Sequence, residues 1–376
     1  MVLQDGRCGT DRLKESSYLM SNPETTLRQD IKDIWLGLEH ESRVLNGCTI
    51  LVTGGAGFLG SYFVDAFLLL NDMGLNPACN VIVVDNYSSS TPMNLKHLEG
   101  RSDLRIVAAD VSRPLDALPK CDYVIHAASI ATPVTYRKHP LETIRANTIG
   151  TWNLLESAHR WGTRGFLMLS TSEVYGDPDP SQVPTPETYW GNVNPIGPRA
   201  CYDESKRMAE TLCTTYFRAH GTPVKITRLF NVYGPRMALD DGRLIPDLMR
   251  NALAGNPLVL YSDGQATRSL CYVSDAMRQM MSVLLRGKDG EVYNIGHSQE
   301  MTVHQIALLV AKLVGISGVE LRQHSDPNYL IDNPKRRCPD MRKTGQICQP
   351  LNKVAIEQGI LQTARWHGIR VQVNTQ

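Results

Sequence analysis

The sequence predicts an α/β protein with a doubly wound parallel sheet and a smaller C-terminal α/β lobe. Three observations support this prediction. Short apolar runs, typical of buried strands, alternate with longer helical segments through the first 230 or so residues. A glycine-rich turn joins the first such strand to the helix that follows it. Beyond residue 231, proline, glycine and aspartate become frequent and the predicted helices shorten, which indicates a second lobe.

The strand and helix predictions divide the chain into three parts. Strands are predicted at residues 48–54, 80–85, 105–110, 122–127, 165–170 and 224–229, and helices at 61–70, 140–160 and 201–220. Apolar side chains at helical spacing also predict an amphipathic helix over residues 26–43, packed on the main domain or on a partner subunit. We therefore expect an N-terminal arm at 1–45, a dinucleotide-binding domain at 46–231 and a substrate lobe at 232–376. Residues 273–295 are expected to return to the first sheet as a helix and a strand.

Composition and charge exclude several classes of partner. The chain has 376 residues and a formal net charge of +1, so nothing favours a nucleic-acid or membrane-surface partner. Nine cysteines occur without a CxxC pair or a zinc-type His/Cys spacing, so we expect no metal site and reduced thiols. The sequence shows neither a membrane-spanning run nor a signal-peptide pattern, and we expect a cytoplasmic protein.

The glycine-rich turn predicts a dinucleotide site. Residues 54–60 read Gly-Gly-Ala-Gly-Phe-Leu-Gly and stand between a strand and a helix, where backbone amides and the helix dipole can hold a pyrophosphate. Asp85 ends the second strand, where a carboxylate can accept both ribose hydroxyls of NAD and would repel the extra phosphate of NADP. No arginine follows it, so the predicted cofactor is NAD. The predicted cofactor contacts are Gly54, Gly57, Phe58, Leu59, Gly60, Asp85, Asn86, Asp110, Val111, Ala127, Tyr202 and Lys206, with a helix cap as the alternative role for Asp110.

Tyr202 and Lys206 form the predicted catalytic pair. Four residues apart on a helix, they share one face. A free phenol is a poor base at neutral pH, but the ammonium of Lys206 and the positive nicotinamide ring of NAD would favour its ionised form. The phenolate could then take a proton from a sugar hydroxyl as the carbon is oxidised. Thr171, at the end of the fifth strand, can hydrogen-bond the same oxygen.

Four segments carry a resemblance to a known family. They are residues 170–177 (STSEVYGD), 189–198 (YWGNVNPIGP), 199–206 (RACYDESK) and 228–236 (RLFNVYGPR). From about Asn46 to Pro350 the chain resembles the extended short-chain dehydrogenases/reductases of the nucleotide-sugar epimerase/dehydratase type. The resemblance implies a Rossmann-type sheet, bound NAD, a nucleotide-sugar substrate and a homodimer. Within the family, the second segment is most similar to the UDP-glucuronate decarboxylases.

Residues 171–173 distinguish the reactions of that family. The 4,6-dehydratases carry an aspartic acid that expels a hydroxyl where this chain has Ser172, and the 4-epimerases usually lack a carboxylate at Glu173. The resemblance therefore implies oxidation of UDP-glucuronate at C4 and loss of CO2 from the β-keto acid, giving UDP-xylose or the 4-keto pentose. Thr171, Ser172, Glu173, Tyr202, Lys206 and Arg337 are the implied catalytic residues. The alternatives are a 4-epimerase, an apiose-forming synthase, which usually has cysteine at this serine, and a non-catalytic NAD-binding scaffold.

The resemblance also implies a set of substrate contacts. Tyr136 would lie near the sugar carboxylate, and Arg337 and Glu173 near the reacting carbons. The remaining residues would bind the nucleotide and its diphosphate, for which the guanidinium fork is well suited. They are Asn231, Arg236, Arg243 and Arg268.

Overall fold

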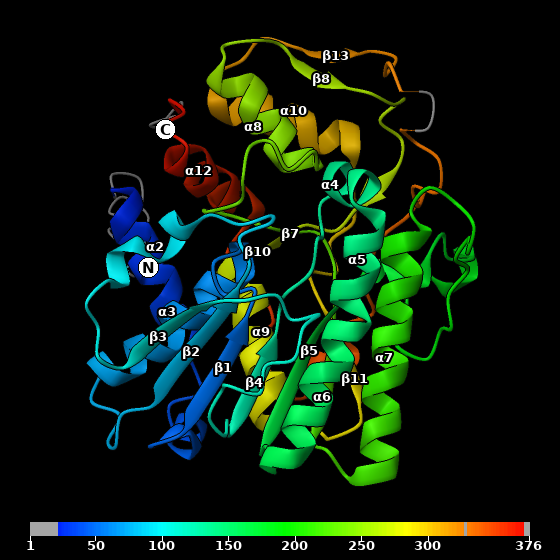
Figure 1. Ribbon diagram of the computed structural model, residues 1–376. Coiled ribbons are helices and arrows are strands. Elements are labelled where there is room, and N and C mark those ends of the chain that lie inside the picture. Colours follow the sequence, from blue (N-terminus) through cyan, green and yellow to red (C-terminus); the bar gives the residue numbers. More distant parts are fainter. Residues whose placement is uncertain (1–21, 327–328, 372–376) are drawn as a thin grey trace, which may run out of the picture.

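A seven-stranded parallel sheet forms the centre of the molecule (Figure 1). A computed structural model describes residues 22–326 and 329–371. The strands are β1 (Thr49–Thr53), β2 (Asn80–Asp85), β3 (Leu104–Ala108), β4 (Tyr123–His126), β5 (Gly165–Thr171), β6 (Val224–Leu229) and β11 (Val292–Ile295). Their order across the sheet is β11-β6-β5-β4-β1-β2-β3, with every neighbouring pair parallel. The order reverses between β1 and β4, which is where ligands bind in such sheets.

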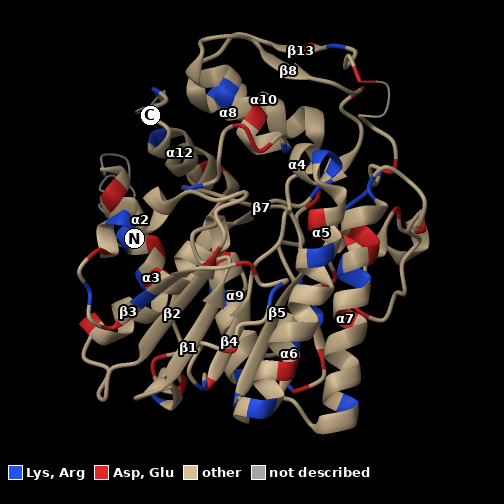
Figure 2. Cartoon of the chain, in the orientation of Figure 1, with Lys and Arg blue, Asp and Glu red and all other residues tan. Residues whose placement is uncertain are grey.

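Helices cover both faces of this sheet, as a doubly wound fold requires. Helices α3 (Phe58–Asp72) and α9 (Val273–Arg286) pack on one face, and α6 (Ile149–Trp161) and α7 (Ala200–His220) pack on the other (Figure 1). Successive side chains of β1 point to opposite faces of the sheet. Ile50 and Val52 pack in the core beneath α3 and α9, and Leu51 packs in the core beneath α6 and α7. The predicted fold class is confirmed. Figure 2 shows acidic and basic residues interspersed along the chain, as the net charge of +1 leads one to expect.

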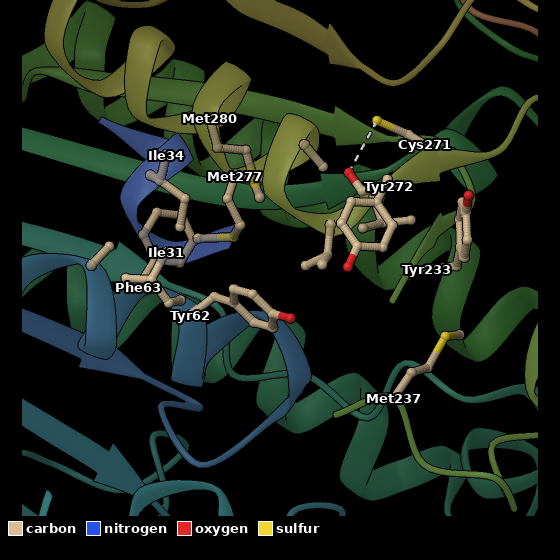
Figure 3. Close-up of a cluster of buried hydrophobic side chains, with 14 of the residues drawn as sticks. Ile31, Ile34, Tyr62, Phe63, Tyr233, Met237, Cys271, Tyr272, Met277 and Met280 are labelled. Carbon is tan, nitrogen blue, oxygen red and sulfur yellow. Dashed lines mark hydrogen bonds between the residues drawn. The ribbon is translucent and has the colours of Figure 1, made fainter. Parts of the chain in front are cut away.

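The N-terminal helix is shorter than predicted. Helix α2 (Pro23–Ile34) begins at the cap Asn22 and ends nine residues before the predicted end at Arg43. The chain then turns at Gly37, whose φ of +73° is easily reached only without a side chain, and continues in a short 3-10 turn at Glu41–Leu45. The apolar face of α2 packs against this same chain. Figure 3 shows Ile31 and Ile34 against Phe63, Met277 and Met280. Residues 1–21 of the predicted arm lie outside the described residues.

The predicted single helix at residues 140–160 is two helices. Helix α5 (Pro140–Asn147) ends at Asn147, Thr148 caps both helices, and α6 starts at Ile149. Each side of the break is anchored separately. The amide of Asn147 donates to Ser205 Oγ on α7 at 2.9 Å, and the backbone at Gly150 lies so close to Val111 that a Cβ would stand 2.7 Å from its side chain. The periodicity of the sequence does not reveal such anchors.

The second lobe stands over the carboxyl ends of the strands (Figure 1). It contains α8 (Leu244–Leu253), α10 (Val303–Val314) and α12 (Ile356–Trp366), with the two-stranded pairs β8–β13, β9–β12 and β7–β10. The strands of these pairs are β7 (Val232–Tyr233), β8 (Leu258–Leu260), β9 (Thr267–Arg268), β10 (Cys271–Tyr272), β12 (Met301–Thr302) and β13 (Val319–Leu321). Two further short helices are α4 (Pro133–Lys138) and α11 (Arg342–Gly345). A cavity of about 1800 Å³ lies between the lobe and the sheet.

Candidate active site

All the predicted site residues line this one cavity. The group near the glycine turn comes from the ends of β1 to β4, and the catalytic group comes from the end of β5 and the start of α7. The predicted substrate residues come from α4, from the ends of β5 and β6, and from β9 and the loops of the second lobe. Residues far apart in the sequence meet here because the carboxyl ends of parallel strands share one edge of a sheet.

The glycine turn forms a cradle that side chains would fill. A Cβ at Gly54, where φ is +67°, would lie 2.7 Å from the backbone of Ala128, and one at Gly60 would lie 2.0 Å from the carbonyl oxygen of Gly54. Helix α3 begins directly after Gly57, and no side chain in the part of the chain that the structure describes caps its first amides. The turn therefore presents free N–H groups and the positive end of the helix dipole to the cavity, which suits a pyrophosphate.

Asp85 is held in place at the end of β2. Its Oδ2 accepts the Ala56 N–H at 2.9 Å, and its Oδ1 accepts the Tyr87 N–H at 2.8 Å and the Ser90 hydroxyl at 2.7 Å. The carboxylate is thus oriented beside the glycine turn, where ribose hydroxyls can reach it. Asp110 lines the cavity too and also caps a turn, because its Oδ1 accepts the Ser112 N–H at 2.8 Å.

Tyr202 and Lys206 are buried side by side in the first turns of α7. The Lys206 ammonium donates to the Leu169 carbonyl at 2.8 Å, and burial lowers its pKa to about 8. Burial raises the pKa of Tyr202 to about 12, while its hydrogen bond with Thr171 opposes that rise. Burial thus disfavours the phenolate in the protein alone. The positive nicotinamide ring of bound NAD would favour it.

Glu173 is clasped by two arginines. Its Oε2 accepts hydrogen bonds from Arg199 Nη2 and Arg337 Nη2, each at 2.7 Å. Burial would raise the pKa of this carboxyl, but the charges of Arg199, Arg337 and Arg268 hold it below its usual value. The opposite holds for Asp203, because burial and the nearby Glu173 charge raise its pKa well above the usual value.

The other predicted arginines differ in how they are paired. Arg268 is buried, and its hydrogen bonds within the described chain all go to carbonyl oxygens, those of Thr267, Pro334 and the Asn333 side chain. Burial and the charge of Arg337 lower its pKa to about 9.

Arg236 and Arg243 are each paired with an aspartate. Arg236 Nη1 lies 2.5 Å from Asp65 on α3. The arginine that was predicted to bind the diphosphate is therefore already paired with a carboxylate of the protein. Arg243 is half-exposed and donates to Asp241 at 2.6 Å. Asn231 has a positive φ of +38° and lies 3.5 Å from Arg337 Nη1.

Comparison with known proteins places the chain in a family. Residues 50–296 match the model of the NAD dependent epimerase/dehydratase family. The chain belongs to this family. UDP-glucuronic acid decarboxylase 5 of Arabidopsis thaliana is 42% identical over 311 residues, which cover 83% of this chain and 86% of that protein. UDP-glucuronic acid decarboxylase 1 of Xenopus tropicalis is 40% identical over 317 residues, which cover 84% of this chain and 71% of that protein.

Solved structures of the epimerase/dehydratase family share the fold. UDP-glucose 4-epimerase of Thermotoga maritima with UDP-glucose matches with a TM-score of 0.73 and 27% identity, over 85% of this chain and 98% of that one. The dTDP-glucose 4,6-dehydratase DesIV of Streptomyces venezuelae, as a double mutant with NAD bound, matches with a TM-score of 0.74 and 29% identity. The match covers 85% of this chain and 96% of that one. The predicted family and NAD cofactor are confirmed, and the glycine turn and Asp85 are the residues that would hold the cofactor here.

For this epimerase/dehydratase, sequence reasoning overlooked Arg199, which lines the cavity, and Asp203, which pairs with it. Arg199 and Asp203 flank Tyr202 and stand within the same matched segment, but their charges were not assigned a role. Their positions at the start of a helix that carries the catalytic tyrosine could have indicated them. Among the described residues, no group of three or more His, Cys, Asp or Glu side chains could hold a metal ion. In the same part of the chain, no helix combines the length and apolar character needed to cross a membrane.

Proposed function

We propose that this protein is an NAD-dependent UDP-glucuronate decarboxylase that forms UDP-xylose or releases the 4-keto pentose. One observation carries the proposal: a buried cluster of arginines beside the catalytic tyrosine has more positive charge than its carboxylates can balance. Arg199, Arg268 and Arg337 surround Glu173, and Arg268 has no carboxylate partner among the residues the structure describes. Asp203 lies beside Arg199, so two carboxylates face three arginines in this cluster.

A buried cation without a partner is costly, so this cluster favours an anionic ligand. A glucuronate adds a carboxylate to the two phosphates of the nucleotide sugar, whereas a glucose does not. The names of the relatives point to the same substrate, since they are UDP-glucuronic acid decarboxylases at 40–42% identity.

The residues of the cavity support the corresponding chemistry. When bound, NAD supplies the acceptor for the hydrogen and electron pair removed from C4 of the sugar. Tyr202 takes the proton of the C4 hydroxyl as a phenolate, the ionised form that the Lys206 ammonium favours from the same helix face. As the bond between C5 and the carboxylate breaks, CO2 leaves and the bonding electrons move onto the C4 oxygen, which Tyr202 and Thr171 stabilise. A proton delivered to C5, directly or through water, then gives the 4-keto pentose, and return of the hydride to C4 with the proton from Tyr202 gives UDP-xylose. Ser172 has no acidic group to expel a hydroxyl, which disfavours dehydration.

The direct test is to incubate the purified protein with UDP-glucuronate and NAD and to follow CO2 and the sugar by NMR. We expect CO2 release with a pentose product, and Tyr202→Phe should abolish it while NAD still binds. A C4 epimer formed without CO2 would establish an epimerase instead, and a branched pentose would establish an apiose-forming synthase. If the protein binds NAD but forms no product, only the role of a non-catalytic scaffold remains.

A homodimer is also part of the proposal. Helices α5, α6 and α7 lie side by side and expose large apolar side chains, including Leu141 (63% exposed), Trp152 (51%) and Met208 (47%). Exposed apolar patches of this kind mark protein interfaces. Light scattering should give twice the mass of the chain, and Trp152→Glu should give a monomer. Trp190→Glu is the matched control, because Trp190 is 88% exposed in a loop outside these helices. A monomeric parent protein would refute the dimer.

We further propose a cytoplasmic location. The eight cysteines of the described chain are all free thiols, which suits a reducing compartment. Cell fractionation with an antibody against the native protein tests this, and enrichment in the membrane or secreted fraction would contradict it.

A further inference from the structure

A single carboxylate oxygen of Glu173 is shared by two arginines that come from different parts of the fold. Arg199 stands at the start of α7, and Arg337 belongs to an irregular segment of the second lobe. The side chains of Glu173, Arg199 and Arg337 are 12%, 7% and 12% exposed, so neither contact is a loose surface pair. Together with the nearby Arg268, these arginines carry three positive charges against the carboxylates of Glu173 and Asp203, so one positive charge is in excess in this part of the cavity.

The two arginines are held differently. The Arg199 guanidinium lies over the ring of Tyr136, 5.8 Å from its centroid, and its Nε is 3.6 Å from the Asp203 carboxylate. Neither arginine has a hydrogen-bond partner at Nε among the described residues. Apart from the bond to Glu173, the only hydrogen bond of the Arg337 side chain in that part of the chain is a marginal one, 3.5 Å from Asn231 Oδ1. Arg337 lacks the ring contact and the second carboxylate that hold Arg199, so it is the freer of the two to turn to a ligand.

We infer that Arg199 is a positioning residue that keeps Glu173 paired and in place while Arg337 transfers from Glu173 to the carboxylate of the substrate. The inference rests on the proposed function, because it needs a sugar that carries a carboxylate. With Arg199 retained on Glu173, each carboxylate has one arginine after the transfer, and no buried charge is left alone. Loss of CO2 removes the carboxylate from Arg337, which then returns to Glu173 and restores the starting arrangement.

The inference predicts a specific change in selectivity. Without Arg199, Arg337 would be the only strong partner of Glu173 and would be held there, so the carboxylate of the substrate would lose its arginine. In a Tyr202→Phe background, where bound sugar is not consumed, the Kd values of UDP-glucuronate and UDP-glucose are measured by calorimetry with NAD present. Arg199→Met should reduce the preference for UDP-glucuronate roughly tenfold, the value of one charge-assisted hydrogen bond.

Arg228→Met is the matched control. Arg228 is also largely buried, with 12% of its side chain exposed, and it is paired with Glu210 at 2.6 Å and lies 4.7 Å from the centroid of the Tyr175 ring. Neither Arg228 nor Glu210 lines the cavity. It should destabilise the protein and leave the ratio of the two Kd values unchanged. A reduced ratio in both variants would mean that any buried arginine has this effect, which would overturn the inference.

Arg199→Lys provides the conservative rescue. A lysine keeps the charge but makes a single contact, so its ratio should lie between those of the parent and the methionine variant. An unchanged ratio in Arg199→Met overturns the inference, and if that variant does not fold, an unchanged ratio in Arg199→Lys does so. If the unmodified enzyme releases no CO2 but the ratio still falls, the proposed reaction fails and the positioning role stands. If CO2 is released and the ratio does not fall, only the positioning role fails.

Discussion

The ring of Tyr136 is stacked on the ring of Tyr202, with 5.1 Å between their centroids and 6° between their planes. Tyr136 comes from α4 and Tyr202 from α7, so the catalytic ring is held from a second element. The Tyr136 hydroxyl is buried and has no hydrogen-bond partner among the described residues, which leaves it available to a ligand. Tyr136 can thus act through its ring on Tyr202 and through its hydroxyl on the sugar.

The first prediction separates these two roles. Tyr136→Leu removes the stacked ring and should lower kcat about tenfold, because small displacements of a catalytic group are costly. Tyr136→Phe keeps the ring and should change KM for UDP-glucuronate more than kcat. Initial rates of UDP-xylose formation measure both. Equal losses of kcat in the two variants would assign the role to the hydroxyl alone.

The second prediction concerns the buried ammonium of Lys206. Its pKa falls from 10.5 to about 8 because of burial. Between these values the unfolded chain keeps a proton that the folded protein has lost, so the free energy of unfolding rises with pH. From pH 7 to pH 9, the stability of the parent protein should therefore rise by about 1 kcal/mol relative to Lys206→Met. Urea unfolding of both proteins at pH 7 and pH 9 measures this difference. Ionisation of the cysteine thiols does not contribute to it, because the two proteins carry the same cysteines. A constant difference would contradict the lowered pKa.

The third prediction grades the glycine turn by the space each position offers. A Cβ added to Gly60 would lie 2.0 Å from the carbonyl oxygen of Gly54, whereas a Cβ added to Gly57 would lie 3.1 Å from the same oxygen. Gly60→Ala must displace the backbone and should weaken NAD binding at least tenfold, about 1.4 kcal/mol. Gly57→Ala should cost less, since a small adjustment suffices. Titration with NAD gives both affinities, and the reverse order would show that the turn relaxes freely.

The fourth prediction addresses the Arg236–Asp65 pair. Asp65→Asn leaves the buried Arg236 charge without its carboxylate and should destabilise the protein by about 3 kcal/mol. The double variant Asp65→Asn/Arg236→Met should recover part of that loss, because no lone charge remains. Thermal unfolding measures both.

The single variant Arg236→Met then tests whether this arginine also binds the diphosphate. The pairing with Asp65 predicts a small change in KM for UDP-glucuronate relative to the loss of stability. A tenfold rise in KM without loss of stability would show a direct phosphate contact instead.

The fold was largely predictable because the strands are short apolar runs bounded by polar residues. The predicted strand at residues 80–85 coincides with β2, and the order of strands and helices agrees throughout the sheet. Helix ends were less predictable. The end of α2 depends on a turn at Gly37 and the break after α5 on contacts of Asn147 with α7, which are tertiary features.

The same distinction applies to the site. Strand ends and the helix spacing of Tyr202 and Lys206 indicate which residues gather at the cavity. Which arginine pairs with which carboxylate depends on side chains from three separate elements, as at Glu173, Arg199 and Arg337. No local pattern in the sequence encodes those pairings, so Arg199 and Asp203 emerged only from the structure.

The packing of α2 limits how far the chain can be shortened. The region of family similarity begins at residue 50, yet Asp30 accepts a hydrogen bond at 2.7 Å from the hydroxyl of Tyr272, 242 residues further on, and Ile34 and Trp35 fill the space beside α3 and α9. A gene trimmed to the matched region would leave that hydroxyl without its acceptor and uncover an apolar surface beside the second lobe. The limits of sequence similarity and the limits of an independently folding unit therefore fall at different residues in this protein.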